Sequence, residues 1–146
     1  MSITVRALVD GDHAAWRRLF RDYGVFYETH FADDVLDQVW AKLRAGDGVH
    51  ALVAEVDGEV VGIAHYRSHP DTFSAGRDWF LDDLFVDPSS RSGGVATALI
   101  EHLTALAKAT GPGTLRWITA DDNERAQRVY DRLAKRTTWV TYEVRL

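Results

Sequence analysis

The sequence contains no cysteine, so disulfide bonds, thiolate metal sites and a cysteine nucleophile are excluded. No segment approaches the ~20 consecutive apolar residues that span a bilayer, and the opening MSITVRALVDGDHAAW lacks the basic and apolar regions of a secretory signal. Histidines at metal-ligand spacing, such as H-E-x-x-H, are also missing, so no metal site is expected. These absences predict a cytoplasmic protein with no membrane partner.

Basic residues are fewer than acidic ones, 17 against 22, which gives a net charge of −5. A nucleic-acid-binding protein usually carries a basic face for the phosphates, so no nucleic-acid partner is expected. An acidic surface would instead attract cations, including protonated amines. With 146 residues, 46% of them hydrophobic, the chain fits one domain, 1–146, that folds around its own core.

Hydrophobic periodicity predicts alternating strands and helices along the chain. Asp57 and Gly58 lie between two apolar runs and predict a β-hairpin over 50–67. The expected order is β α α β β β α β α β, which indicates an α/β or α+β layered domain with a mixed sheet. The other expected strands are 2–9, 79–86, 114–119 and 137–146, and the helices begin near residues 10, 33, 95 and 121.

The stretch RSGGVATALIEHL, residues 91–103, places an arginine and two glycines directly before a periodic apolar helix. The first N–H groups of such a helix have no internal partner, and the helix dipole adds partial positive charge there. With Gly93 and Gly94 removing side-chain bulk, the junction suits a phosphate or diphosphate; the alternative is a plain turn. Neither the P-loop pattern nor G-x-G-x-x-G is present, so a P-loop nucleotidase and a dinucleotide fold are unsupported.

RSGGVA resembles the [QR]-x-x-G-x-[GA] signature of the GNAT superfamily of acyl-CoA-dependent N-acyltransferases, with Arg91, Gly94 and Ala96 at the defining places. LDDLFVDPSS before it resembles the family's fourth strand, and NERAQRVY after it is similar to a later motif. The similarity covers the whole chain and most resembles the branch that acetylates small amines, polyamines, D-amino acids and histones. One departure is that Leu133 to Trp139 stand where many relatives have Gly-Phe. The resemblance implies the GNAT fold, a mixed, mostly antiparallel sheet of six to seven strands with four helices.

The same resemblance implies where acetyl-CoA, the expected co-substrate, would bind. Backbone groups of the fourth strand would bond the pantetheine arm, and the loop amides with Arg91 would hold the diphosphate. The implied cofactor-binding residues are Leu84, Phe85, Val86, Arg91, Ser92, Gly93, Gly94, Val95, Ala96, Thr97 and Asn123. Asn123 has a second interpretation, because asparagine is a preferred helix N-cap and it stands where the last helix should begin.

Tyr130 matches the position of the family's usual general acid, which gives a proton to the departing thiolate of coenzyme A. A phenol with a pKa near ~10 can serve a thiolate whose thiol has a pKa near ~8.5. The alternative is an interior tyrosine, because Ala126, Val129, Tyr130 and Leu133 form one apolar stripe of a helix.

Asp82 and Asp83 are adjacent in an apolar strand, so the pleat is expected to send them to opposite faces. In relatives that acetylate polyamines the position matching Asp82 is acidic, so it is the candidate general base, acting through water. Asp83 is the second candidate, with a salt bridge to an arginine as the alternative. Tyr27, Glu28 and His65 are further candidates for the acceptor site.

These observations predict an N-acetyltransferase that moves an acetyl group from acetyl-CoA to a primary amine of a small molecule by direct attack in a ternary complex. A protein lysine or N-terminus is an alternative acceptor, and a non-catalytic acyl-CoA-binding regulatory module is an alternative of another class. A homodimer is also expected, through TTWVTYEVRL at residues 137–146, whose apolar edge would otherwise be exposed.

Overall fold

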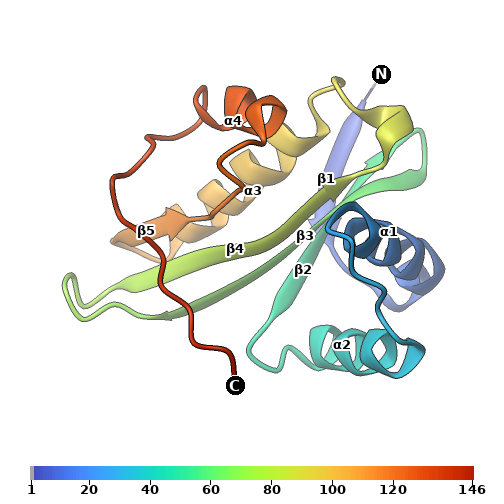
Figure 1. Ribbon diagram of the computed structural model, residues 1–146, viewed down its shortest axis with the longest axis horizontal. Coiled ribbons are helices and arrows are strands. Elements are labelled where there is room, and N and C mark those ends of the chain that lie inside the picture. Colours follow the sequence, from blue (N-terminus) through green and yellow to red (C-terminus); the bar gives the residue numbers. More distant parts are fainter. Residues whose placement is uncertain (1) are drawn as a thin grey trace.

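A computed structural model describes residues 2–146, which fold around one five-stranded sheet of order β1-β2-β3-β4-β5 (Figure 1). Neighbouring strands run antiparallel from β1 to β4, and β5 runs parallel to β4. The sheet is therefore mixed, as the sequence predicts. The strands are β1 Ile3–Ala7, β2 His50–Val56, β3 Glu59–Pro70, β4 Arg77–Val86 and β5 Gly113–Arg116.

Helices cover both faces of the sheet. Figure 1 shows α1 and α2 on one side and α3 on the other. The helices are α1 His13–Phe26, α2 Asp33–Ala45, α3 Val95–Ala109 and α4 Glu124–Tyr130, with short 3₁₀ turns at η1 Asp10–Asp12 and η2 Pro88–Ser90. Across residues 2–146, no helix is both long and apolar enough to cross a bilayer.

The turn between β2 and β3 forms where the sequence predicts a hairpin. Asp57 has φ of 52° and Gly58 has φ of 81°, so both central residues lie in the left-handed region. Two left-handed residues define the turn whose twist matches a β-hairpin. The hairpin supplies the two central strands on which the rest of the sheet is built.

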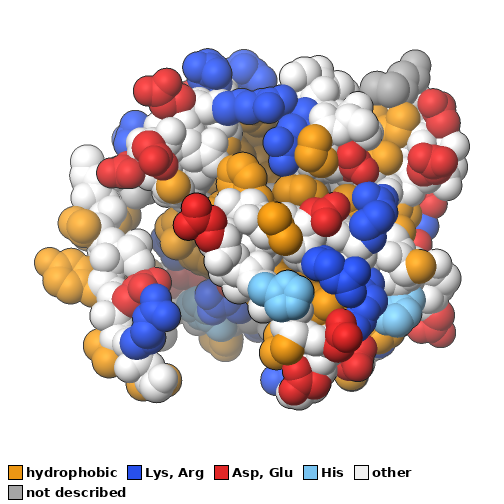
Figure 2. All heavy atoms as spheres, turned by 45° about the vertical axis from the view of Figure 1, so that its right-hand side comes forward, with side chains coloured by type: hydrophobic (Ala, Val, Ile, Leu, Met, Phe, Trp, Pro, Cys, Tyr) orange, Lys and Arg blue, Asp and Glu red, His pale blue; other side chains and the backbone are white. Residues whose placement is uncertain are grey.

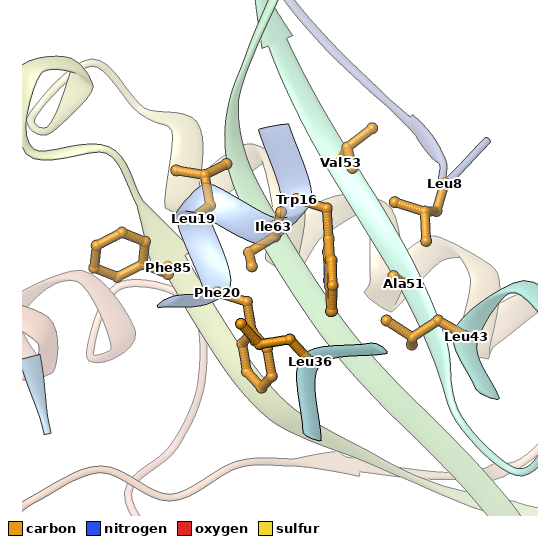
Figure 3. Packing of buried hydrophobic residues seen from close by; sticks show 10 residues of the cluster. All are labelled: Leu8, Trp16, Leu19, Phe20, Leu36, Leu43, Ala51, Val53, Ile63 and Phe85. Carbon is orange, nitrogen blue, oxygen red and sulfur yellow. The ribbon is translucent and has the colours of Figure 1, made fainter. Parts of the chain in front are cut away.

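The core consists of two clusters, one on each face of the sheet. Alternate residues of β2 divide between them: Ala51 and Val53 face α1 and α2, whereas Leu52 and Ala54 face α3. Figure 3 shows the first cluster, in which the Trp16 side chain from α1 lies beside the central strands with Leu36 from α2 close by. This division follows from the period of two in a strand, so an alternating apolar run can fill two cores.

Gly62 of β3 allows α3 to pack directly on the sheet. A Cβ atom at this position would lie 2.9 Å from Val95 Cγ1 and 3.3 Å from Leu99 Cδ1, both closer than an ordinary contact. Val95 is the first residue of α3. The start of α3 is thereby held close to the sheet.

The sheet opens along one side of β4. Its pairing with β5 runs from Arg77 with Gly113 to Phe80 with Arg116, and β5 ends there, whereas β4 continues to Val86. Between Leu81 and Val86, β4 has β3 on one side and no strand on the other among residues 2–146. On that side the backbone groups have no strand to pair with, and one of them, the oxygen of Val86, accepts a hydrogen bond from the Arg91 side chain.

The C-terminal part differs from the sequence prediction. The last helix ends at Tyr130 rather than near residue 135, and residues 137–146, which we call the C-terminal segment, form no strand. The described sheet therefore has five strands, not six to seven. An alternating pattern specifies extended backbone but does not specify the edge with which it pairs, and a short helix gains little stability from its own hydrogen bonds.

Candidate active site

A cavity of about 690 Å³ lies where β4 continues beyond β5, and we call it the main cavity. It lies between the end of α1, the end of β4, the start of α3 and α4. The lining residues are Tyr23, Phe26, Tyr27, Leu84, Phe85, Val86, Ser90, Arg91, Ser92, Gly94, Val95, Ala96, Thr97, Asn123, Arg125, Ala126, Arg128, Val129, Tyr130 and Arg132. Four segments that are distant in sequence therefore enclose one space.

The start of α3 presents bare backbone to the main cavity. Gly94 is the N-cap, with φ of 86°, and no side chain accepts a hydrogen bond from the first turn of the helix. The helix dipole adds partial positive charge at this end. Ser92 also has a left-handed φ, of 68°, so the loop is bent tightly just before the helix. The arrangement suits an oxygen-rich anion such as a phosphate.

Arg91 is held in place beside this helix start. Its Nε donates to the backbone oxygen of Val86 at 3.3 Å. Its guanidinium lies over two aromatic rings, 5.9 Å from the Phe26 centroid and 5.5 Å from that of Phe85. Stacking and one backbone bond leave the other N–H groups available, so a fixed positive charge lies beside the main cavity.

Three further arginines of the main cavity lay outside the sequence prediction: Arg125, Arg128 and Arg132. Their spacing of three and four residues places them on one face of α4 and the turn after it. Figure 2 shows Lys and Arg side chains gathered at the top of the molecule, above a hollow with hydrophobic side chains. The spacing is visible in the sequence, but it identifies a binding face only when that face is known to meet the main cavity.

Asn123 is the N-cap of α4, and its Oδ1 accepts a hydrogen bond from the backbone N–H of Ala126 at 3.2 Å. It also lines the main cavity. Asn123 therefore caps the helix, as one interpretation predicts. Because it also faces the main cavity, its predicted contact with a bound molecule stays a prediction.

Tyr130 is the last residue of α4 and lines the main cavity. Its ring packs edge to face against Trp117, with 5.5 Å between centroids. Burial raises the pKa of the Tyr130 phenol, and the neighbouring Tyr27 raises it further. The phenol is therefore protonated throughout the neutral range, so it can donate a proton or a hydrogen bond into the main cavity.

A smaller space of about 30 Å³, which we call the recess, adjoins the same residues. Tyr23, Tyr27, Leu84 and Tyr130 line both the recess and the main cavity. The remaining lining residues of the recess are Leu81, Asp82, Trp117, Ile118 and Thr119. Tyr130 therefore lines both the space that contains the Asp82 carboxylate and the space that contains the start of α3.

The expectation that Asp82 and Asp83 point to opposite faces is wrong. β4 has a register shift opposite His65 and Tyr66, so that Asp83 pairs with His65 and Leu81 with Tyr66 while Asp82 is the extra residue. Arg67, two residues after His65 and thus on the same face, donates its Nε to both oxygens of Asp82 at 3.0 Å. A β-bulge re-aims a side chain in this way, and the period-two rule does not apply across it.

Asp83 bonds to a histidine rather than to an arginine. His65 Nδ1 lies 2.9 Å from Asp83 Oδ2, and the His65 ring is buried near the middle of β3. His65 lies outside the residues that line the main cavity and the recess, as do Asp83, Glu28 and Gly93, whereas Tyr27 lines both spaces. Tyr23 of α1, which the sequence does not single out, also lines both.

Metal-ligating side chains do not cluster here. No group of three or more His, Cys, Asp or Glu residues within residues 2–146 is placed to hold a metal ion.

Known proteins resemble this chain in sequence and in fold. The sequence model of the Acetyltransferase (GNAT) family matches residues 13–134. The chain is 30% identical to the D-amino-acid N-acetyltransferase HPA3 of Saccharomyces cerevisiae, over 97% of this chain and 89% of that protein. It is 29% identical to the thialysine N-epsilon-acetyltransferase of Bos taurus, over 90% of this chain and 82% of that protein.

A solved structure has the same fold: AAC(6')-Iy in complex with the bisubstrate analog CoA-S-monomethyl-acetylneamine. It superposes with a TM-score of 0.85 over 100% of this chain and 99% of that one, at 22% identity.

Proposed function

Because the chain belongs to the GNAT family of acetyltransferases and is an acetyl-CoA-dependent N-acetyltransferase, we propose that it acetylates the primary amine of a small molecule. A polyamine, an amino acid or a similar amine is the proposed acceptor. The observation that carries this proposal is the placement of Tyr130 between the main cavity, with its basic end, and the recess, with its carboxylate.

The residues present fit coenzyme A. The uncapped start of α3 and the fixed guanidinium of Arg91 suit a diphosphate, and Arg125, Arg128 and Arg132 add further positive charge. The unpaired side of β4 between Leu84 and Val86 offers backbone groups to the amide-bearing pantetheine arm. When bound, acetyl-CoA supplies a thioester, whose acetyl carbon is open to attack by an amine.

The acceptor end fits a small cation. The recess is about 30 Å³ and contains the Asp82 carboxylate, which Arg67 holds in one orientation. An alkylamine is mostly protonated at neutral pH, and a free electron pair is needed for attack. Asp82 would attract the ammonium ion and accept its proton through a water molecule.

Tyr130 would complete the transfer. In the proposed step the acceptor nitrogen would bond to the acetyl carbon and release its extra proton to solvent, and the carbon–sulfur bond would break. Tyr130 would give its phenolic proton to the departing sulfur and then regain a proton from solvent. Because its pKa is raised, the phenol is protonated at neutral pH before the transfer. Most of the rate enhancement would come from holding the two substrates together.

A thiol-release assay with acetyl-CoA tests the proposal. The panel contains polyamines, D- and L-amino acids, aminoglycosides and lysine peptides, with mass spectrometry of the product. We expect thiol release that depends on a small amine and a product heavier by one acetyl group. Turnover only with peptides would indicate that the acceptor is a protein and not a small molecule. No turnover with any amine would contradict the proposal.

We further propose a homodimer formed through the C-terminal segment. Val140, Tyr142 and Val144 alternate with polar residues, and their exposed fractions are 78%, 91% and 87%. An extended apolar segment of this kind is suited to pair with a sheet edge of a second copy, such as that of β5.

Light scattering at several concentrations tests the dimer. Tyr142→Lys should shift the molecule toward the monomer, whereas Phe73→Ser, at another fully exposed site, should not. A strict monomer in the unmodified protein would refute this proposal.

A further inference from the structure

An ion pair borders the recess. Arg67 of β3 donates its Nε to both carboxylate oxygens of Asp82 at 3.0 Å, and Asp82 lines the recess. The Arg67 guanidinium also lies over the Phe80 ring of β4, 4.9 Å from its centroid. The carboxylate and the stacked ring together fix the position of the guanidinium. The exposed fractions of the Arg67 and Asp82 side chains are 49% and 28%, so a solute can reach both.

The guanidinium of Arg67 has donors to spare. It carries five N–H groups, and within residues 2–146 only the one on Nε has an acceptor. Arg44 of α2 is built in the same way, with its Nε on Asp10 at 2.7 Å and its guanidinium over the Trp40 ring. There, however, Nη1 also donates to the backbone oxygen of Leu8 at 2.8 Å. The two Nη groups of Arg67 therefore stay available to bind a carboxylate through parallel hydrogen bonds.

Each of the three aspartates of β4 already has a partner. The pairs are Asp78 with Arg116 at 3.4 Å, Asp82 with Arg67 at 3.0 Å, and Asp83 with His65 at 2.9 Å. Asp82 is the one acidic residue in the described lining of the recess. A polyamine carries several positive charges and no negative charge, so the guanidinium beside Asp82 would repel it. A molecule with one charge of each sign can instead interact favourably with both members of the pair.

We propose that Arg67 is a specificity-determining residue that binds the carboxylate of an amino-acid acceptor. Asp82 faces the ammonium group, and the Nη groups of Arg67 bond to the carboxylate of the same molecule. In an α-amino acid one carbon atom separates the two charged groups, which suits a carboxylate and a guanidinium that are themselves in contact. This inference rests on the proposed function and narrows its acceptor to an amine that carries a free carboxylate.

Steady-state kinetics with acetyl-CoA test the inference on two acceptors, the panel amino acid of highest kcat/KM and its α-amide. The amide keeps the amine and the side chain but lacks the negative charge. Arg67→Gln should lower kcat/KM for the amino acid about 10- to 100-fold more than for the amide, because only the amino acid loses a hydrogen bond between charged groups. Any displacement of Asp82 affects both acceptors alike, so the ratio of the two isolates the contact with the carboxylate.

Three further variants sharpen the test. Arg67→Lys keeps the charge but not the pair of parallel donors, so its ratio should lie between those of Arg67→Gln and the unmodified protein. Arg67→Glu reverses the charge and should raise kcat/KM for a diamine relative to the amino acid. Arg44→Gln is the matched control, because it removes an arginine with the same kinds of contact. It should leave the ratio unchanged.

Equal losses for the amino acid and the amide in Arg67→Gln would overturn the inference and leave the proposed function intact, because Arg67 would then only hold Asp82. Turnover of polyamines or aminoglycosides but of no amino acid by the unmodified protein would do the same, and this result requires no variant to fold. Turnover with peptides alone, or with no amine in the panel, would overturn the proposed function and this inference together.

Discussion

The two ends of the site are built in different ways. The proposed anion-binding end is built mainly from one continuous stretch, residues 84–97, through its backbone groups and Arg91, to which the arginines of α4 and the turn after it add charge. The acceptor end depends on side chains from α1, from the bulge of β4 and from the segment after β5. A short motif can specify the first end because its geometry is local, whereas the second exists only when distant segments meet.

The largest effect is expected where the two ends meet. Tyr130→Phe should lower kcat about 10²- to 10³-fold, because the departing sulfur loses its proton donor. The affinity for coenzyme A should stay within about twofold, because the phenol hydroxyl is not required for phosphate binding. Stopped-flow or coupled thiol assays give the first value and calorimetry gives the second. An unchanged kcat would remove Tyr130 from the reaction.

A second substitution separates the acceptor end from the anion-binding end. Asp82→Asn should lower kcat/KM for the amine about 10- to 100-fold by removing the charge that attracts and deprotonates the ammonium ion. Binding of coenzyme A should not change. Asp78→Asn is the matched control, since Asp78 is on the same strand and forms an ion pair with Arg116, at 3.4 Å. Equal losses in both variants would point to strand stability instead.

The reverse pattern is expected at the anion-binding end. Arg91→Ala should weaken coenzyme A binding about 10-fold, with little change in kcat at saturation, and the loss should shrink as salt is raised. Arg91→Lys keeps the charge but loses the stacking on Phe26 and Phe85. Its affinity for coenzyme A should therefore lie between those of Arg91→Ala and the unmodified protein. Arg17→Ala, which breaks surface ion pairs with Asp33 and Asp37, is the control. The affinities are measured by calorimetry at two salt concentrations. If Arg91→Ala bound coenzyme A as tightly as the unmodified protein, this prediction would be wrong.

The smallest effect concerns pH. A group with a raised pKa keeps its proton below that pKa and loses it above, so Tyr130 should remain an acid to beyond pH ~10. At saturating amine, loss of the Tyr130 proton should therefore not lower kcat at any pH up to about 10. A falling limb centred near pH 8 to 9 in the unmodified protein, absent in the variant, would contradict the burial of the phenol.

The sequence was informative where structure is locally encoded. Asp57 and Gly58 predict their hairpin because two left-handed residues in succession allow few other turns. The glycine loop predicts the start of α3 for a similar reason. The resemblance named Tyr130, Asp82 and the cofactor residues together, and most of them lie around one space in the structure. Their roles remain predictions until the variants are measured.

What the sequence missed depends on tertiary contacts. The bulge at Asp82 depends on how β3 and β4 register, and nothing in LDDLFV indicates it. That Tyr23 lines a cavity could not be predicted from its place on α1, because the cavity exists only where β4 continues beyond β5 beside this helix. The C-terminal segment has a strand pattern without a strand partner in the described chain.

Gly62 lines neither the main cavity nor the recess, yet it sets how far the α3 amides lie from the sheet. A single methyl group there would push Val95 outward, and the diphosphate would then sit at the wrong distance from the thioester it carries. A screen for loss of acetyl-CoA use should therefore recover changes at this interior position as well as at the loop before α3.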